Sequence, residues 1–114
     1  MSTPTSTIAV GTDRITLINV FTVDPSRQTE LVDALDASTQ KIFVTMPGFI
    51  SANLHVGIDG TRVVNYAQWT SEQAYKNAMS RDDLREHLVE IASIAESYDP
   101  TLVHVHAIHH AQGS

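Results

Sequence analysis

The sequence contains no cysteine, so disulfide bonds, iron–sulfur clusters and thiol nucleophiles are excluded. A chain without disulfides fits a reducing compartment, although it does not require one. Basic residues are also few, because seven Lys and Arg stand against 13 Asp and Glu, which gives a net charge of −6. Phosphate backbones repel so acidic a chain, and no basic stripe interleaved with aromatic residues appears. We therefore expect neither a nucleic-acid partner nor an anionic-membrane partner.

Long hydrophobic runs are missing as well. No segment approaches the ~18 apolar residues of a membrane-spanning helix, and residues 1–13 lack the basic and apolar regions of a signal peptide. We expect a soluble cytoplasmic protein in which residues 1–13 form a flexible leader. The 114 residues, 42% of them hydrophobic, support one globular domain, expected over residues 14–108 and followed by a tail over residues 109–114.

The first half of the domain carries clear strand and helix signals. β-Branched residues predict a strand over Arg14–Val23, and Asp24-Pro25 supplies an N-cap with proline in the first helical turn. The helix is expected to run to about Val44, before Pro47-Gly48. Its buried side is expected to carry Leu31, Leu35, Ile42 and Phe43.

A hairpin follows this helix. Alternating apolar and polar residues predict a strand over residues 49–58, and Asp59-Gly60 predicts a two-residue turn. The returning strand is expected over Arg62–Trp69. This register places Val56 opposite Val63, Leu54 opposite Asn65, and Ala52 opposite Ala67.

The last third predicts two helices and a strand. Thr70 or Ser71 caps a short helix, and Ser80, with Asp83 three residues later, predicts the cap of another. This second helix is expected to end near Asp99-Pro100, with the last strand over residues 101–108. Its buried stripe is expected to hold Leu84, Leu88, Ile91, Ala95 and Tyr98.

The order β-α-β-β-α-β predicts an α+β, ferredoxin-like fold, in which the helices cover one face of a four-stranded antiparallel sheet. Some strands are apolar on both faces, as at Val63-Val64 and at Val103 with Val105. The face without helices therefore needs a cover, and a second copy of the same sheet is the simplest one. We expect a homodimer with the form of a dimeric α/β barrel.

A polar group interrupts the apolar face of the strand Arg62–Trp69. Side chains alternate along a strand, so Asn65 shares its face with Ala67 and Trp69. A buried amide without a partner costs about 1–3 kcal/mol, so either the protein or a ligand must bond to Asn65. The small side chains of Ala52 and Ala67 leave room for a ligand beside it.

The segments VVNYAQW and SEQAY, within residues 63–75, are preceded by PGF, SA and DG and followed by LRE. Together they resemble the antibiotic biosynthesis monooxygenase family, over about Ile15 to Ile108, and most of all its anthrone-oxidising members. The resemblance implies a ferredoxin-like dimer that oxidises an aromatic polyketide of the anthrone or hydroquinone type to a quinone. It also implies that molecular oxygen is the oxidant and that no metal, flavin or haem cofactor takes part.

The resemblance further implies catalytic roles for four residues. Asn65 and Trp69 would donate hydrogen bonds to substrate oxygens. Tyr75 would hold or relay a proton, and Arg85 would stabilise anionic species. Taken alone, each has an ordinary structural explanation: core packing for Trp69 and Tyr75, a main-chain hydrogen bond for Asn65, and an ion pair with Asp82 for Arg85.

Four residues are expected to bind the substrate, namely Ala52, Leu54, His55 and Ala67. Leu54 stands where one anthrone-oxidising member has a tyrosine, which leaves the identity of the polyketide open. The resemblance places His55 in the site, whereas the hairpin register points His55 away from Asn65. The two lines of reasoning disagree on this residue.

Other functions remain open. His104 and His106 share a strand face near His109-His110, but no third ligand stands at a defined spacing, so we expect no metal site. A haem-degrading monooxygenase of the same superfamily would need a histidine ligand; none directly follows Trp69, the nearest being His87, although Asn19 favours this alternative. A non-enzymatic dimeric ligand-binding module is the other alternative, since fold does not fix function.

Overall fold

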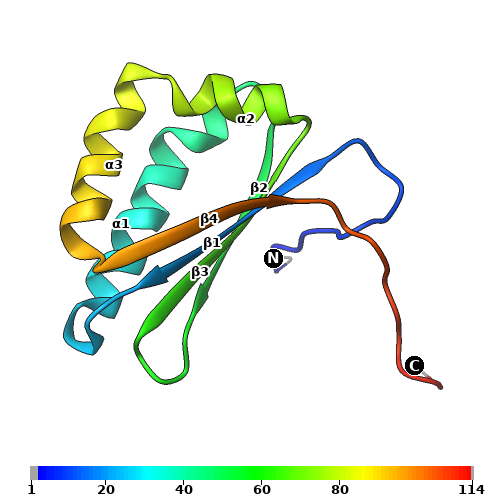
Figure 1. The fold of residues 1–114 in the computed structure, drawn as a ribbon, viewed down its shortest axis with the longest axis horizontal. Helices are drawn as coiled ribbons and strands as arrows, with labels where there is room; N and C mark the ends of the chain where they lie inside the picture. The colour runs from blue at the N-terminus through cyan, green and yellow to red at the C-terminus, as the bar shows by residue number, and fades with distance from the viewer. Residues whose placement is uncertain (1–2, 114) are drawn as a thin grey trace.

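The computed structural model describes residues 3–113 and contains one antiparallel sheet, with all its α-helices on one face (Figure 1). The sheet has four strands in the order β2-β3-β1-β4. The strands are β1 (Ile15–Thr22), β2 (Phe49–Val56), β3 (Arg62–Trp69) and β4 (Ser97–Val103). The α-helices are α1 (Gln28–Lys41), α2 (Glu72–Met79) and α3 (Asp82–Ile94). This arrangement confirms the predicted ferredoxin-like fold.

Helix boundaries agree only in part with the sequence signals. The helix predicted up to Val44 is divided into a 3-10 turn (Pro25–Arg27), α1, and a second 3-10 turn (Phe43–Thr45). Asp24 is the predicted cap, since its carboxylate accepts a hydrogen bond from the Ser26 N–H at 2.9 Å.

The caps of the two later helices differ from each other. Ser71 caps α2, and its hydroxyl accepts a hydrogen bond from Ala74 N–H at 3.1 Å. The prediction that Ser80 caps α3 was wrong, because its hydroxyl donates to the Asn77 carbonyl at the end of α2. The N-cap of α3 is Arg81, which makes no side-chain capping bond.

The hairpin register is confirmed, whereas its turn is not. Ala52 pairs with Ala67, Leu54 with Asn65, and Val56 with Val63. The turn is not a two-residue one at Asp59-Gly60: Gly60 N–H donates to the Gly57 carbonyl, and β2 already ends at Val56. Gly60 has a φ of 83°, which glycine adopts without steric cost.

The last strand begins earlier than predicted. It spans Ser97–Val103 instead of residues 101–108, and α3 ends at Ile94 instead of near Asp99-Pro100. β4 lies at the edge of the sheet, where a proline without an N–H is tolerated, so Pro100 does not mark a break. Tyr98 therefore lies on β4, its ring centroid 6.2 Å from that of Phe21. His104 and His106 lie beyond the strand and are exposed.

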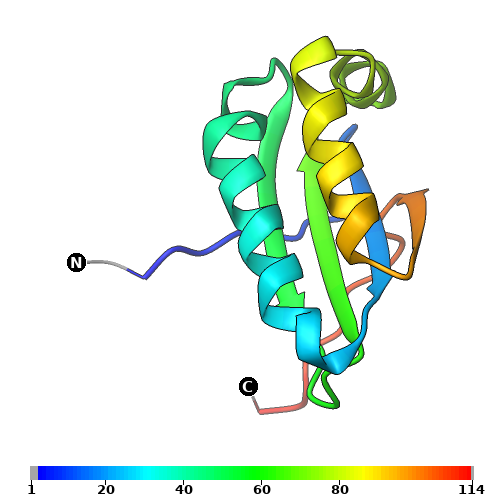
Figure 2. The same ribbon diagram turned by 90° about the vertical axis from the view of Figure 1, so that its left-hand side faces the viewer.

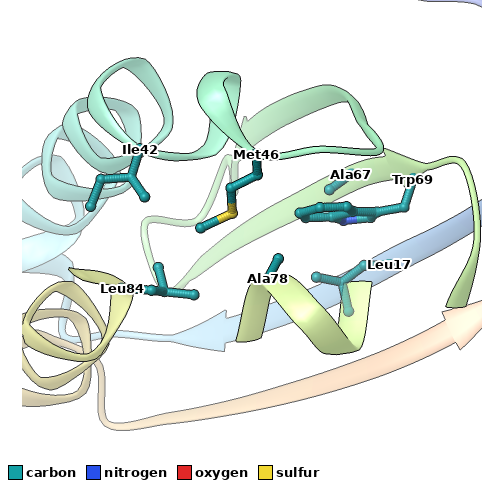
Figure 3. Close-up of a cluster of buried hydrophobic side chains, with 7 residues drawn as sticks. All are labelled: Leu17, Ile42, Met46, Ala67, Trp69, Ala78 and Leu84. Atoms are coloured by element: carbon teal, nitrogen blue, oxygen red, sulfur yellow. The ribbon is translucent and has the colours of Figure 1, made fainter. Parts of the chain in front are cut away.

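The core lies between the sheet and the helices and consists of two clusters. One surrounds Trp69, as Figure 3 shows, and the other surrounds Leu31. Of the buried stripes predicted for the helices, Leu31, Ile42, Leu84 and Ile91 are buried. Leu35, Phe43 and Ala95 are half-buried, whereas Leu88 is 42% exposed.

Within residues 3–113, no helix covers the other face of the sheet (Figure 1). In Figure 2, which views the molecule from the helix side, α1 and α3 lie in front of the strands. Part of the predicted flexible leader contacts this face: Gln68 Nε2 donates to the Thr7 carbonyl at 2.7 Å, and Ser6 Oγ donates to Asn53 Oδ1 at 2.5 Å. Residues 1, 2 and 114 of the predicted leader and tail lie outside the described residues. Within residues 3–113, no helix is long and apolar enough to cross a membrane.

Candidate active site

A cavity of about 190 Å³ lies between the sheet and the helices. It is larger than an engineered apolar cavity of about 150 Å³ that takes up benzene. Most of the side chains in its wall are apolar, and eight are polar. These are Asn19, Ser38, Thr39, Asn65, Trp69, Tyr75, His87 and Tyr98.

The strand register brings two amides together in this wall. Asn65 on β3 pairs directly with Asn19 on β1, and Trp69 lies on the same face of β3. Pairing and alternation place all three side chains on the helix-covered face of the sheet. Ala52 and Ala67, which also line the cavity, keep the floor beside the amides open.

Three buried polar atoms have no hydrogen-bond partner within the described part of the chain. They are Asn19 Oδ1, Asn65 Oδ1 and Trp69 Nε1. Leaving such a group unpaired costs about 1–3 kcal/mol each. All three residues line the same cavity, and the terminal torsion of an asparagine side chain turns easily. A guest that carries both hydroxyl and carbonyl groups can therefore pair with all three atoms, because hydroxyls donate to the amide oxygens and a carbonyl accepts from the indole N–H.

The Trp69 indole is held in place by aromatic side chains. Its ring meets those of Phe43, Phe49 and Tyr75 edge to face, with centroid distances of 6.3, 5.4 and 5.8 Å. Such contacts fix ring orientation and add about 0.5–1.5 kcal/mol per pair. The indole lies in the space between β3 and the helices, on the same side as Met46 and Leu84 (Figure 3). Its N–H is thus a rigid donor.

The Tyr75 phenol is a donor at neutral pH. Burial raises the pKa of this phenol above its ordinary value, because desolvation disfavours the phenolate. The ordinary value is already about 10, so the hydroxyl keeps its proton under physiological conditions.

The cavity opens between α3 and β4. Leu88 on α3 and Tyr98 on β4 both line it and are 42% and 56% exposed. Pro100, one strand position further along this face, is also exposed. These residues form a solvent-exposed rim of the cavity.

Not every residue predicted for the site reaches the cavity. Arg85 is exposed and lies outside the lining, so its guanidinium does not point inward as expected. His55 pairs with Val64, is exposed, and its Nδ1 lies 3.0 Å from the Asn53 carbonyl oxygen. The register therefore places His55 correctly, on the opposite face. Leu54 is half-buried beside Asn65 but lies outside the lining.

Sequence reasoning missed a histidine in the wall. His87 on α3 lines the cavity, and its Nδ1 lies 3.1 Å from the hydroxyl oxygen of Ser38 on α1. The signal was available, because His87 stands three residues after Leu84 and four before Ile91, both of which are buried. The distance of 18 residues between His87 and Trp69 in the sequence hides this proximity.

A ferredoxin-like sheet, a mostly apolar cavity beneath its helices and unpaired polar atoms in the cavity wall define a protein that binds a small molecule. The profile of the antibiotic biosynthesis monooxygenase family matches residues 14–89. The chain belongs to this family.

Individual relatives support the assignment. The chain is 41% identical over 90 residues to tetracenomycin-F1 monooxygenase of Streptomyces glaucescens, covering 79% of this chain and 80% of that one. A Streptomyces coelicolor monooxygenase solved in complex with the ligand nanaomycin D is 33% identical, with a TM-score of 0.71 over 86% of this chain and 92% of that one. The cofactor-independent oxygenase SnoaB of Streptomyces nogalater shares the fold, at 23% identity and a TM-score of 0.68, covering 90% and 99% of the two chains.

Proposed function

We propose that the protein is a cofactor-independent monooxygenase that oxidises an aromatic polyketide of the anthrone or hydroquinone type to a quinone with molecular oxygen. The observation that carries the proposal is the set of unpaired polar atoms on Asn19, Asn65 and Trp69 around one apolar cavity. Two relatives above 30% identity support the class of substrate, because one is named for tetracenomycin F1 and the other was solved with nanaomycin D.

The side chains suit a reaction that passes through an anion. A carbon between two aromatic rings and conjugated with a carbonyl loses a proton readily, provided that the resulting oxyanion receives hydrogen bonds. In this proposal the amide nitrogen of Asn65 and the indole N–H of Trp69 donate them, and donors preorganised in a site without bulk water act strongly. Tyr75, which keeps its proton, supplies a further donor at the same wall.

Oxygen then completes the reaction without a cofactor. The substrate anion gives one electron to O₂, and the resulting radical pair combines to a hydroperoxide. Loss of water from the hydroperoxide leaves a new carbonyl, so one oxygen atom enters the product and the other leaves as water. The protein has to orient the guest, assist proton removal and stabilise negative charge. Arg85, which is exposed, is not assigned a contact with the substrate.

The function is tested by incubating the protein in air with dithranol or emodinanthrone and following quinone absorbance. We expect formation well above the uncatalysed rate and incorporation of one labelled oxygen atom from labelled O₂. Binding without turnover would instead identify a non-enzymatic ligand-binding module. A haemin titration belongs in the same experiment, because His87 lines the cavity and could ligate iron; a Soret shift with haem breakdown would contradict the proposal.

Filling the cavity should prevent binding while leaving the fold intact. Ala67→Leu adds apolar atoms to a side chain that is 3% exposed and lines the cavity. We expect affinity for a quinone product to fall at least tenfold, because the guest and the new side chain compete for one space. Fluorescence of the single tryptophan reports the binding. Ala37→Leu on the exposed side of α1 is the matched control; unchanged affinity in Ala67→Leu would place the guest elsewhere.

We propose that the protein acts as a homodimer paired through the sheet face without helices. Val64, half-buried on this face, and Ile18 opposite Tyr66 form an apolar surface beside the end that the leader contacts. Val64→Glu should convert a dimer to a monomer in light scattering, whereas Val89→Glu, on an exposed position of α3, should not. A wild-type protein that is monomeric at all concentrations would contradict the pairing.

A further inference from the structure

The cavity wall contains a hydrogen-bonded pair that none of the roles above uses. His87 Nδ1 lies 3.1 Å from Ser38 Oγ, and Ser38 is 3% exposed. The Ser38 hydroxyl also donates to the Ala34 carbonyl, one turn earlier on α1, at 3.0 Å. The pair joins α1 to α3 across the top of the cavity, and both residues line it.

Both contacts are hydrogen bonds at the same time in one arrangement of the protons. A serine hydroxyl has a single hydrogen to donate, and here the Ala34 carbonyl receives it. The short contact with His87 is then a hydrogen bond only if Nδ1 carries the proton and Ser38 Oγ accepts it. A neutral imidazole with hydrogen on Nδ1 has its basic lone pair on Nε2.

We propose that His87 is the general base of this site, with Nε2 taking the proton from the substrate carbon, and that Ser38 positions the ring. The inference rests on the proposed monooxygenase function. Among the residues that line the cavity, the remaining titratable groups are the phenols of Tyr75 and Tyr98. Phenols are protonated near neutral pH, whereas an imidazole accepts a proton there. Asparagine and tryptophan do not titrate, and Arg85 lies outside the lining.

The proton transfer balances within the site. The C–H bond of the substrate breaks, its electron pair stays on carbon and is delocalised onto the ring carbonyl oxygen, and a new N–H bond forms at Nε2. The oxyanion is stabilised by the donors of Asn65 and Trp69, and the imidazolium by its bond to Ser38 Oγ. After O₂ has added to the carbon, the imidazolium gives its proton to the distal oxygen of the peroxide anion, which becomes a hydroperoxide. Nε2 then takes the remaining hydrogen of that carbon as a proton while the O–O bond breaks, and this proton and the departing hydroxide form water as the new C=O bond is made.

The test compares His87→Gln with the wild type in the anthrone assay. Glutamine keeps a polar side chain but accepts no proton, so kcat should fall about 10²–10⁴-fold, the usual range for a general base, with little change in KM. Replacing the transferred hydrogen by deuterium should give a larger isotope effect in the variant, and added imidazole should restore part of the rate. His106→Gln, at an exposed position beyond β4 and outside the cavity lining, is the matched control and should match the wild type.

Ser38→Ala tests the positioning role. We expect a loss of roughly tenfold in kcat, the value of one hydrogen bond, with KM unchanged. Nitrogen NMR should show the Nδ1–H tautomer for His87 in the wild type and a mixture of tautomers in Ser38→Ala, a change that mere loss of packing would not produce.

The outcomes separate the two proposals. A wild-type enzyme that turns over, together with a folded His87→Gln variant of equal kcat, overturns the assignment of the base alone. An Nε2–H tautomer in the wild type overturns it too, and this measurement does not depend on the folding of any variant. A wild-type protein that oxidises no anthrone overturns the proposed function and the base with it.

Discussion

Asn65→Leu should make the protein more stable and almost inactive. Asn65 Oδ1 is buried without a partner, and removing such a group relieves a penalty of about 1–3 kcal/mol. Leucine has room beside Asn65 because the cavity adjoins it. Loss of one preorganised donor to a developing oxyanion should lower kcat about 10²–10³-fold. Urea unfolding and the quinone assay measure the two effects on the same sample.

Asn53→Leu is the matched control for this variant. Asn53 lies on the neighbouring strand β2, but its amide is satisfied, because Nδ2 donates to the Tyr66 carbonyl at 2.9 Å and Oδ1 accepts from Ser6. The same substitution there should reduce stability and leave kcat near the wild-type value. If Asn65→Leu instead destabilises the fold and keeps its activity, Asn65 is an ordinary structural residue.

Trp69→Phe should lower kcat by about 10²–10³-fold with only a small change in stability. Phenylalanine keeps edge-to-face contacts with Phe43, Phe49 and Tyr75 but has no N–H. Its smaller ring loses packing, and that loss is offset because the variant no longer buries the unpaired Nε1. Thermal unfolding and steady-state kinetics measure the two quantities.

An isosteric replacement isolates the donor from the ring. Benzothienylalanine at position 69 has nearly the shape of tryptophan, with sulfur in place of the N–H, so it should behave like Trp69→Phe in kcat. Full activity with this side chain would mean that Trp69 contributes shape and no hydrogen bond. Trp69→Ala is less informative, since truncating a buried aromatic residue costs about 3–5 kcal/mol.

The strand face that carries the site was predictable because side chains alternate with a period of two. Asn65 and Trp69 had to share a face wherever β3 began. The predicted pairing of β3 with β2 is correct although the predicted turn is wrong. A four-residue loop centred on the same position gives the same register as the predicted two-residue turn. The position of Asn65 in the alternation along β3, and not the type of turn, therefore decides that its amide faces the helices.

The end of α3 was not predictable from local signals. Asp99-Pro100 has the composition of a helix stop, yet it lies in an edge strand whose outward N–H positions need no partner. β4 lies at the edge because of the strand order of the whole sheet, and a local stretch of sequence does not determine that order. The same strand carries Tyr98, which therefore forms the rim of the cavity instead of part of a helix.

Helix phase explains the errors at Arg85 and His87. One residue turns a helix by about 100°, so Arg85 faces solvent although Leu84 beside it is buried. His87, three residues after Leu84, returns to the buried face and meets Ser38. Their contact depends on how α1 packs against α3, which periodicity alone does not supply.

The central claim is that an aromatic guest satisfies the polar groups left unpaired in this cavity. The chain has a single tryptophan, so one indole N–H signal in a proton–nitrogen NMR spectrum reports on Trp69 without ambiguity. Adding a quinone product should shift this signal downfield and slow its exchange with solvent, as expected for a donor that gains an oxygen partner. A signal that stays unchanged while the quinone binds would contradict the claim.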